Sequence, residues 1–250
     1  MISLKGKVAV VTGGSRGIGA AVSTLFAKAG ASISLTYVSD KRSAERCAAS
    51  LRDFGQRCLV TKAEVSQLRD VKKVVKNTMK MFGRIDILVN NAGVWKRGEI
   101  GKMTERQWDE TLDINLKGTF FFCNAVSPIM KKQRWGRIIN VASTAGQRGE
   151  AFYSHYAASK GGMIAFTKSI AVELSPFNIN VNAVAPGWVD TDMSADALRG
   201  TGRTEIEKSI PRGKVATPED VAGAALFLAS NLANHIVGAT ISVNGGGVLI

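Results

Sequence analysis

Tyr156 and Lys160 stand four residues apart, a spacing that places two side chains on one face of a helix, one turn from each other. An ammonium group that close favours the phenolate over the phenol, so it is expected to draw the pKa of the tyrosine down toward neutrality. A phenol tuned in this way can exchange a proton with a substrate oxygen near pH 7. Because the same spacing also occurs by chance on solvated helix faces, its meaning depends on the rest of the chain.

The neighbouring polar residues fit other roles better. Tyr153 is the rival phenol, but Ala157 stands four residues after it, so no cation would tune it. Ser154 and Ser159 are interpreted as helix-start and solvent-facing residues. His155 is interpreted as a surface or packed histidine rather than as a base.

A glycine-rich turn, Thr12–Gly19, follows an apolar run and precedes a helical pattern near the N-terminus. Its glycines follow the spacing Gly-x-x-x-Gly-x-Gly from Gly13. Glycines in this position let the main chain turn sharply and approach a pyrophosphate, which the free N–H groups of the next helix then bind. The context predicts a dinucleotide site, and a ligand-free β–α turn is the alternative.

Polar segments follow several of the predicted strands at the edge where an open α/β sheet binds its ligand. They are Asn90–Gly93 after the fourth strand, Ser143 after the fifth, and Pro186-Gly187 after the sixth, with Thr191 just beyond. Asn115 lies inside the predicted helix after the fourth strand, where asparagine has poor helix propensity and needs a functional or structural reason.

The periodicity of apolar residues predicts strands and helices that alternate along the whole chain. Such alternation indicates a single-domain α/β Rossmann fold over 1–250, with a doubly wound parallel seven-stranded sheet and helices on both faces. The segment 187–214 is long, polar and without clear periodicity, as expected of a mobile lid over the substrate. The expected strands are 7–12, 31–38, 57–62, 85–90, 137–142, 179–185 and 239–243; the expected helices are 17–28, 40–54, 67–82, 105–132 with a break near Gly118, 154–174 and 218–230.

Bulk properties exclude several classes of protein. The net charge of +13 is the excess of 33 lysines and arginines over 20 aspartates and glutamates. The basic residues are scattered along the chain, which disfavours nucleic-acid binding and suits an anionic small molecule or an acidic partner. The three cysteines, Cys47, Cys58 and Cys123, form no Cys-x-x-Cys pair, so we expect reduced cysteines and no metal site. No apolar run reaches the length of a membrane span, and the first residues do not form a signal peptide, so a cytoplasmic location is expected.

Taken together, these motifs resemble the short-chain dehydrogenase/reductase family in order and spacing over essentially all 250 residues. Within it, the segments 136–140, 182–187 and 226–230 are similar to those of 3-oxoacyl-[acyl-carrier-protein] reductases. The resemblance implies that Tyr156 protonates a carbonyl oxygen while Ser143 hydrogen-bonds it. Lys160 would lower the pKa of Tyr156 and bind the nicotinamide ribose, and Asn115 would position Lys160 through a water.

The resemblance also implies a nicotinamide cofactor, for which we expect NADP(H). An NAD-specific site usually has a carboxylate at the end of the second strand, where this chain has Tyr37. Arg16 and Ser39 can bind a 2′-phosphate. Asp40, a carboxylate near the expected position, argues for NAD(H) instead, but we interpret it as the residue that starts the next helix. The residues implied in cofactor binding are Gly13, Ser15, Arg16, Gly17, Ile18, Gly19, Tyr37, Ser39, Glu64, Val65, Asn91, Ala92, Gly93, Tyr156, Lys160, Pro186, Gly187, Val189 and Thr191.

Two departures from the family pattern are visible. Glu64-Val65 stands where Asp-Val is usual at the adenine, so Glu64 is either an adenine ligand or a solvated loop residue. Asn244 replaces the usual aspartate of an Asp-Gly-Gly motif near the C-terminus.

The substrate is the most open question. Val94, Trp95, Ala145, Trp188 and Met193 are candidate pocket walls, with ordinary packing as the alternative. The resemblance implies reduction of a 3-oxoacyl thioester, carried by acyl carrier protein or not, and a homotetramer. An alcohol, ketone or glucose-type sugar substrate and a cofactor-sensing regulator remain as alternatives.

A basic cluster is the feature that bears on a carrier protein. Carrier proteins are acidic, so a basic rim at the active-site mouth would steer them in. Arg134 matches one docking arginine of the resembling reductases, and Lys131, Lys132 and Arg137 lie beside it. Phe177 replaces the second docking arginine, which weakens this expectation.

Overall fold

The computed structural model describes residues 2–250, and in it strands and helices alternate along the chain as predicted. Every predicted strand and long helix is present, with ends that shift by at most two residues. The strands are β1 (Val8–Val11), β2 (Ser32–Tyr37), β3 (Cys58–Lys62), β4 (Ile87–Asn90), β5 (Gly136–Val141), β6 (Ile179–Pro186) and β7 (Thr240–Val243). The helices are α1 (Gly17–Lys28), α2 (Lys41–Asp53), α3 (Leu68–Phe82), α4 (Glu105–Leu112), α5 (Gly118–Gln133), α6 (Ala145–Arg148), α7 (Ser154–Leu174), α8 (Thr201–Ser209) and α9 (Pro218–Ala229).

The seven strands form one parallel sheet in the spatial order β3-β2-β1-β4-β5-β6-β7. Ala9 of β1 pairs with Ile33 of β2 on one side and with Ile87 of β4 on the other. The chain therefore builds outward from β1 to β3 and then returns to place β4 beside β1. In an open parallel sheet, this reversal opens a crevice between the loops that follow the two central strands.

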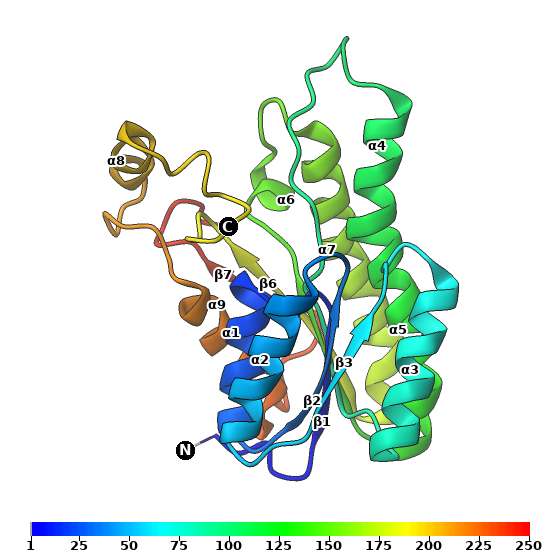
Figure 1. Cartoon of the computed structure of the whole chain (residues 1–250). Helices are drawn as coiled ribbons and strands as arrows, with labels where there is room; N and C mark the ends of the chain where they lie inside the picture. Colours follow the sequence, from blue (N-terminus) through cyan, green and yellow to red (C-terminus); the bar gives the residue numbers. More distant parts are fainter. Residues whose placement is uncertain (1) are drawn as a thin grey trace.

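Helices cover both faces of the sheet (Figure 1), with α1, α2 and α9 on one face and α3, α5 and α7 on the other. Successive residues of a strand point to opposite faces, so each strand feeds two apolar layers. Val11 packs in the layer that contains Phe26, whereas Val10 packs in the layer that contains Phe122. This burial on both faces explains why the strands read as continuous apolar runs.

The helix predicted over 105–132 is not broken at Gly118. A π-helical turn, Asp113–Lys117, joins α4 to α5, and Gly118 keeps helical φ and ψ of −60° and −42°. The glycine has a packing role instead, because a Cβ there would lie 2.8 Å from Cγ2 of Val65. Helix α5 thus passes close over the loop that follows β3.

Two short helices escaped prediction. Helix α6 (Ala145–Arg148) has only four residues, and α8 (Thr201–Ser209) lies within the segment that shows no periodicity in sequence. Within residues 2–250, no helix combines the length and the apolar character that crossing a bilayer requires.

Candidate active site

A cavity of about 550 Å³ opens at the carboxyl ends of the strands, at the crevice set by the strand order. It brings together residues from the glycine-rich turn, from the loops after β2 to β6, and from α7. The predicted catalytic and cofactor-binding residues that line it are Gly13, Ser15, Arg16, Gly17, Ile18, Tyr37, Ser39, Glu64, Val65, Asn91, Ala92, Gly93, Ser143, Tyr156, Lys160, Pro186, Gly187, Val189 and Thr191.

The glycine-rich turn presents free main-chain donors to this cavity. Gly13 and Gly17 have positive φ values of 60° and 51°, which glycine adopts without steric cost. Helix α1 begins at Gly17 with no side-chain cap and no acidic residue in its first turn. Its first N–H groups and its positive end therefore remain available to an anionic group such as a pyrophosphate.

Gly19 does not line the cavity. A Cβ at Gly19 would lie 2.2 Å from the carbonyl oxygen of Gly13 and 2.6 Å from Nδ2 of Asn91. The missing side chain lets α1 pack directly on the turn, and Gly19 supports the site from behind.

Hydrogen bonds join the ends of the two central strands. The Thr12 hydroxyl accepts from the main-chain N–H groups of Asn91 and Ala92 at 2.9 and 3.0 Å. Nδ2 of Asn91 donates to the carbonyl oxygens of Thr12 and Gly13 at 3.0 and 3.1 Å. These bonds set the width of the crevice and explain the polar residues after β1 and β4.

The residues that would face an adenosine ribose come from the glycine-rich turn and from the end of β2. Arg16, Tyr37 and Ser39 line the cavity, and so does Asp40. Asp40 is the N-cap of α2, where its carboxylate accepts from the main-chain N–H and the hydroxyl of Ser43 at 2.9 and 2.6 Å. These hydrogen bonds hold the pKa of Asp40 below its usual range. The interpretation of Asp40 as a helix start is confirmed, although the residue also borders the cavity.

Helix α7 brings Tyr156 and Lys160 to the cavity beside Ser143, which follows β5. Ser143 Oγ accepts from the N–H of Ala145 at 3.1 Å, which orients the hydroxyl group. Lys160 is 4% exposed, and its Nζ donates to the carbonyl oxygen of Val141 at 2.7 Å. The same Nζ lies 5.8 Å from the centre of the Tyr156 ring.

The expectation that Lys160 draws the pKa of Tyr156 toward neutrality is wrong for this structure. Burial raises the pKa of Tyr156 to about 12; the hydrogen bond with Ser143 opposes this rise and the charge of Glu150 adds to it. Burial also lowers the pKa of Lys160 to about 8. The phenol therefore stays protonated at neutral pH and is prepared to donate a proton.

Asn115 is fully buried in the π-helical turn and does not line the cavity. Its Oδ1 accepts from Val94 N at 2.8 Å, and its Nδ2 donates to Val94 O and to Ser159 Oγ, both at 3.0 Å. A Cβ built on Gly93 would lie 3.1 Å from Asn115 Oδ1 and 3.6 Å from Lys160 Nζ, so both groups border the same residue. The asparagine thus stabilises the loop after β4 and the helix that carries Lys160.

Ser159 and His155, two neighbours of Tyr156 on α7, are both buried. Ser159 is fully buried, accepts from Asn115 and donates to the carbonyl oxygen of Tyr156 at 2.7 Å, so its assignment to solvent is wrong. His155 is a packed histidine, as expected, with no exposed surface.

An aromatic wall closes one side of the cavity. The rings of Trp95 and Tyr153 stack with centres 4.5 Å apart, and Trp188 meets Trp95 edge-on at 5.7 Å. Val94, Trp95, Trp188 and Met193 line the cavity as predicted. Ala145 does not line it, because this residue is buried in the first turn of α6.

Comparison with known proteins agrees with this geometry. The sequence profile described as enoyl-(acyl carrier protein) reductase, which belongs to the short-chain dehydrogenase/reductase family, matches residues 13–247. The chain belongs to the short-chain dehydrogenase/reductase family. It is accordingly an oxidoreductase that acts on CH–OH groups and uses a nicotinamide dinucleotide.

Individual relatives cover nearly the whole chain. A 3-oxoacyl-[acyl-carrier-protein] reductase of Chlamydia pneumoniae is 41% identical over 245 residues, 98% of each protein. Its counterpart in Aquifex aeolicus is 39% identical over 245 residues, again 98% of each. Among solved structures, levodione reductase matches with a TM-score of 0.93 and 32% identity, covering 97% of each chain. A glucose/ribitol dehydrogenase from Brucella melitensis matches with a TM-score of 0.93 and 33% identity, covering 100% of this chain and 99% of the other.

The residues present fit the cofactor of this family. The uncapped start of α1 and the positive-φ glycines form a cradle for a pyrophosphate. One continuous cavity runs from Tyr37 and Glu64, where an adenosine would lie, to Ser143 and Tyr156, where a nicotinamide and a substrate would meet. Glu64 is half-buried and faces this cavity.

Sequence reasoning missed several residues that line the cavity of this short-chain dehydrogenase. Arg148 and Glu150 come from the loop between Ser143 and Tyr156, and their position between two reactive residues was an available signal. Further additions include Asp192, Ser209 and Ile210, which lie in the predicted lid 187–214, and Asn244, which departs from the family motif. For Glu110, Gly247 and Val248, which also line the cavity, the sequence carries no comparable signal.

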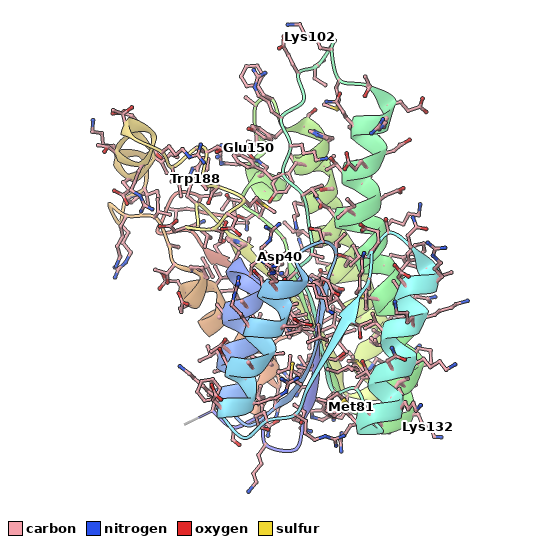
Figure 2. The ribbon with its side chains drawn as sticks, viewed as in Figure 1. Asp40, Met81, Lys102, Lys132, Glu150 and Trp188 are labelled. Carbon is pink, nitrogen blue, oxygen red and sulfur yellow. The ribbon has the colours of Figure 1, made fainter. Side chains whose placement is uncertain are left out.

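The basic cluster 131–137 lies near the amino ends of the strands, whereas the cavity lies at their carboxyl ends. Arg137 pairs with Ile87 near the start of β4, whereas the cavity lies beyond the carboxyl ends of the same strands. Figure 2 accordingly labels Lys132 at the bottom of the molecule and Trp188 above the sheet. Within one chain, the expectation of a basic rim at the active-site mouth is therefore wrong for this cluster.

Arg137, which was expected to belong to a basic docking surface, is buried. Only 1% of the residue is exposed, its guanidinium lies 4.6 Å from the Trp135 ring centre, and it donates to Oδ1 of Asn234. Burial lowers its pKa. Arg137 is thus part of the packing beneath the sheet and is not available to a partner.

Proposed function

We propose that this chain is an NADP(H)-dependent 3-oxoacyl-[acyl-carrier-protein] reductase that converts a 3-oxoacyl thioester to the 3-hydroxyacyl thioester in fatty acid biosynthesis. The observation that carries the proposal is the single cavity that brings the phenol of Tyr156 together with Ser143, Lys160 and the glycine-rich turn. The similarity of the chain, at 39–41% identity, to 3-oxoacyl-[acyl-carrier-protein] reductases supports this choice of substrate.

The chain's own residues supply the acid chemistry. The Tyr156 hydroxyl gives its proton to the carbonyl oxygen, and the Ser143 hydroxyl donates a hydrogen bond that stabilises charge developing on that oxygen. The cofactor, when bound, supplies the hydride. Lys160, fixed by Val141, retains donors for the nicotinamide ribose, and Asn115 holds α7 and the loop after β4 in place.

We propose NADP(H) rather than NAD(H) because no carboxylate occupies the end of β2. Tyr37 stands there, and Arg16 brings a guanidinium to the same part of the cavity. Asp40 opposes this assignment by its charge, but its carboxylate is engaged by Ser43 at the start of α2. Arg16 is exposed and pairs only weakly with Asp192, at 3.4 Å, so it remains free to bind a 2′-phosphate.

The segment 187–214 is proposed to cover the bound substrate. Trp188, Met193, Ser209 and Ile210 line the cavity from this segment, which follows directly on β6. Met193 is 50% exposed, whereas the buried Leu198 and Ile210 of the segment pack with Val215 in a small core of their own. Such segments close over the substrate and exclude water.

A homotetramer is proposed as the assembly. Helices α5 and α7 present a groove lined by Phe120, Phe166 and Ile170, and Phe120 is 44% exposed. Strand β7 forms one edge of the sheet. Light scattering after gel filtration should give four times the 26.6 kDa chain mass; the mass of a single chain would reject this part of the proposal.

A short-chain alcohol, ketone or glucose-type sugar dehydrogenase is the second candidate. The aromatic wall of Trp95, Tyr153 and Trp188 favours it, because flat rings suit a compact cyclic substrate. The structural relatives named as levodione reductase and glucose/ribitol dehydrogenase support the same reading.

The two candidates separate in a substrate comparison. Oxidation of NADPH is followed with acetoacetyl-acyl carrier protein, acetoacetyl-coenzyme A and a cyclic diketone, and reduction of NADP⁺ is followed with glucose. The proposal expects kcat/KM for the thioesters to exceed that for the other compounds by at least about tenfold. Turnover of the ketone or sugar without turnover of either thioester would support the second candidate. A preference for the carrier form that weakens at high salt would indicate charge-steered docking.

A further inference from the structure

The turn that follows β7, residues 244–248, contributes to the cavity without a role in the proposed mechanism. Its residues that line the cavity are Asn244, Gly247 and Val248. Strand β7 is the edge strand beside β6, whereas the ends of β2 and β3, toward the other edge of the sheet, carry Tyr37 and Glu64, where an adenosine would lie. This C-terminal turn therefore lies at the end of the cavity away from the adenosine. Figure 1 shows the C-terminus on the same side of the molecule as α8.

The side chain of Asn244 holds the C-terminal turn together. Its Nδ2 donates to the carbonyl oxygen of Val248 at 2.8 Å, and its Oδ1 accepts from Gly246 N at 2.9 Å. Position 244 thus needs one donor and one acceptor. An ionised aspartate can only accept, so it could not make the contact with Val248. The replacement of the usual aspartate by Asn244 therefore has a structural consequence in this chain.

The C-terminal turn contacts the start of the segment 187–214. Gly187 N donates to the carbonyl oxygen of Val243, the residue directly before the turn, at 3.0 Å. A Cβ at Gly187 would lie 2.9 Å from Cβ of Asn244, so the two residues pack without space between them. The first residue of the segment is therefore fixed against Asn244.

The same turn contacts the other end of the segment. Arg212 N donates to the carbonyl oxygen of Gly245 at 3.0 Å. A Cβ at Gly245 would lie 2.7 Å from Cγ2 of Ile210, and a Cβ at Gly246 would lie 3.3 Å from Cβ of Pro211. Both ends of the segment that is proposed to cover the substrate are thus held by one turn.

These contacts extend to the aromatic wall of the cavity through Ile210. The buried Ile210 packs with Leu198 and Val215 in the small core of the segment. Trp188 packs against this core and meets Trp95 edge-on in the cavity wall. Displacement of the C-terminal turn would therefore disturb Ile210 and, through it, the ring of Trp188.

We propose that Asn244 is a positioning residue that anchors the C-terminal turn and thereby fixes both ends of the segment 187–214 and the cavity wall at the substrate end. When this wall is ordered in advance, substrate binding does not cost the free energy of ordering it. Loss of the anchor should therefore weaken substrate binding more than it slows the chemical step. The proposal rests on the proposed function as a carbonyl reductase covered by 187–214, and it does not depend on which carbonyl compound is reduced.

Asn244→Asp tests the anchor with almost no change of shape, because only the Nδ2 donor is replaced by an oxygen. With ethyl acetoacetate and NADPH, KM for the ester should rise about three- to tenfold, while kcat should change less than about twofold. The dissociation constant of NADPH, measured by fluorescence, should also change less than about twofold, because the adenosine lies at the other end of the cavity. An unchanged KM in Asn244→Asp would overturn the proposal.

Two further variants separate the lost hydrogen bond from the added charge. Asn244→Ala removes both side-chain hydrogen bonds without adding a charge, and it should raise KM at least as much as Asn244→Asp. Asn231→Asp adds the same charge at an exposed residue in the short turn Asn231–Ala233, beside the start of β6, and it should leave KM unchanged. An equal rise of KM in Asn231→Asp would overturn the proposal, because charge alone would then explain it.

Hydrogen exchange followed by mass spectrometry gives a readout that needs no turnover. In Asn244→Asp, the amides of 208–216 and 243–250 should exchange at least about threefold faster than in wild type, because the N–H of Arg212 and the turn lose their support. The amides of β2 should exchange as in wild type. Equal exchange of 208–216 in the two proteins would overturn the proposal.

The two measurements separate the possible failures. Faster exchange with an unchanged KM would show that the anchored wall does not position the substrate, and it would overturn the proposal. Faster exchange in Asn244→Asp, together with a wild type that reduces neither ethyl acetoacetate nor an acetoacetyl thioester, would support the anchoring role of Asn244 and reject the proposed function.

Discussion

The ammonium group of Lys160 donates a hydrogen bond of 2.7 Å to the carbonyl oxygen of Val141, the last residue of β5. This contact ties α7 to the sheet and fixes a cation where the residue is only 4% exposed. Burial lowers the pKa of Lys160 to about 8 from its ordinary value of 10.5. The charged form of Lys160 therefore lowers the free energy of unfolding.

This cost predicts an unusual dependence of stability on pH. Between about pH 8 and 10, the unfolded chain holds the Lys160 proton and the folded chain releases it. Stability rises with pH wherever the unfolded state binds more protons, so the free energy of unfolding should rise across this window. The rise contributed by Lys160 should reach roughly 2 kcal/mol. Urea unfolding of wild type and Lys160→Met at several pH values, without cofactor, measures it. Identical pH dependence in the two proteins would show that Lys160 does not carry this cost.

The proposed role of Arg16 predicts a change in cofactor preference. Arg16→Ala should lower kcat/KM with NADPH by at least about tenfold and change kcat/KM with NADH little, because a charge-assisted contact to the 2′-phosphate is lost. Asp192→Asn is the matched control, since it removes the partner of Arg16 at 3.4 Å and keeps the guanidinium. A wild-type enzyme equally efficient with NADH, or an Arg16→Ala variant with undiminished use of NADPH, is incompatible with this role.

Two glycines in helices should respond oppositely to alanine. A Cβ at Gly146 would lie 2.5 Å from the carbonyl carbon of Lys160 and 2.6 Å from the nitrogen of Gly161, both main-chain atoms that cannot move aside. Gly146→Ala should therefore destabilise the protein by about 1–3 kcal/mol and also lower activity, because Lys160 is displaced. A Cβ at Gly223, in the exposed face of α9, meets nothing within 4 Å. Gly223→Ala should stabilise by about 1 kcal/mol. Urea unfolding of both variants provides the check, and a stable Gly146→Ala protein would mean that α6 and α7 approach less closely than described.

Most of the architecture was readable from the chain because parallel strands buried on both faces leave continuous apolar runs, as in Ile87–Asn90. Residues that follow the strands could be predicted to lie close together, because the carboxyl ends of all parallel strands lie along the same edge of the sheet. The cavity accordingly collects Ser143, Tyr156 and the glycine-rich turn.

The failures share a physical cause, which is that contacts between distant loops leave no local pattern. The stacking of Trp95 on Tyr153 and the hydrogen bond to Glu150 depend on the approach of two loops. The pKa of Tyr156 depends on how deeply the phenol is buried, which spacing from Lys160 does not reveal. The π-helical turn that contains Asn115 has no sequence signature comparable to a capping box.

The basic cluster was misplaced for a different reason. Residues that precede a parallel strand, such as Arg134 before β5, lie at the edge opposite the residues that follow it. The expectation rested on the match of Arg134 to a docking arginine of the resembling reductases, and such a match does not show at which end of the strand the residue lies.

The role of Tyr156 as the proton donor can be measured in one comparison of wild type with Tyr156→Phe. The substitution removes the hydroxyl group that lies in one cavity with Ser143 and Lys160, and it keeps the ring. NADPH oxidation with an acetoacetyl thioester should fall at least about a hundredfold, the usual scale of general acid catalysis, while NADPH binding measured by fluorescence should change little. A variant that keeps more than about a tenth of wild-type turnover would contradict the assignment of Tyr156 as the acid.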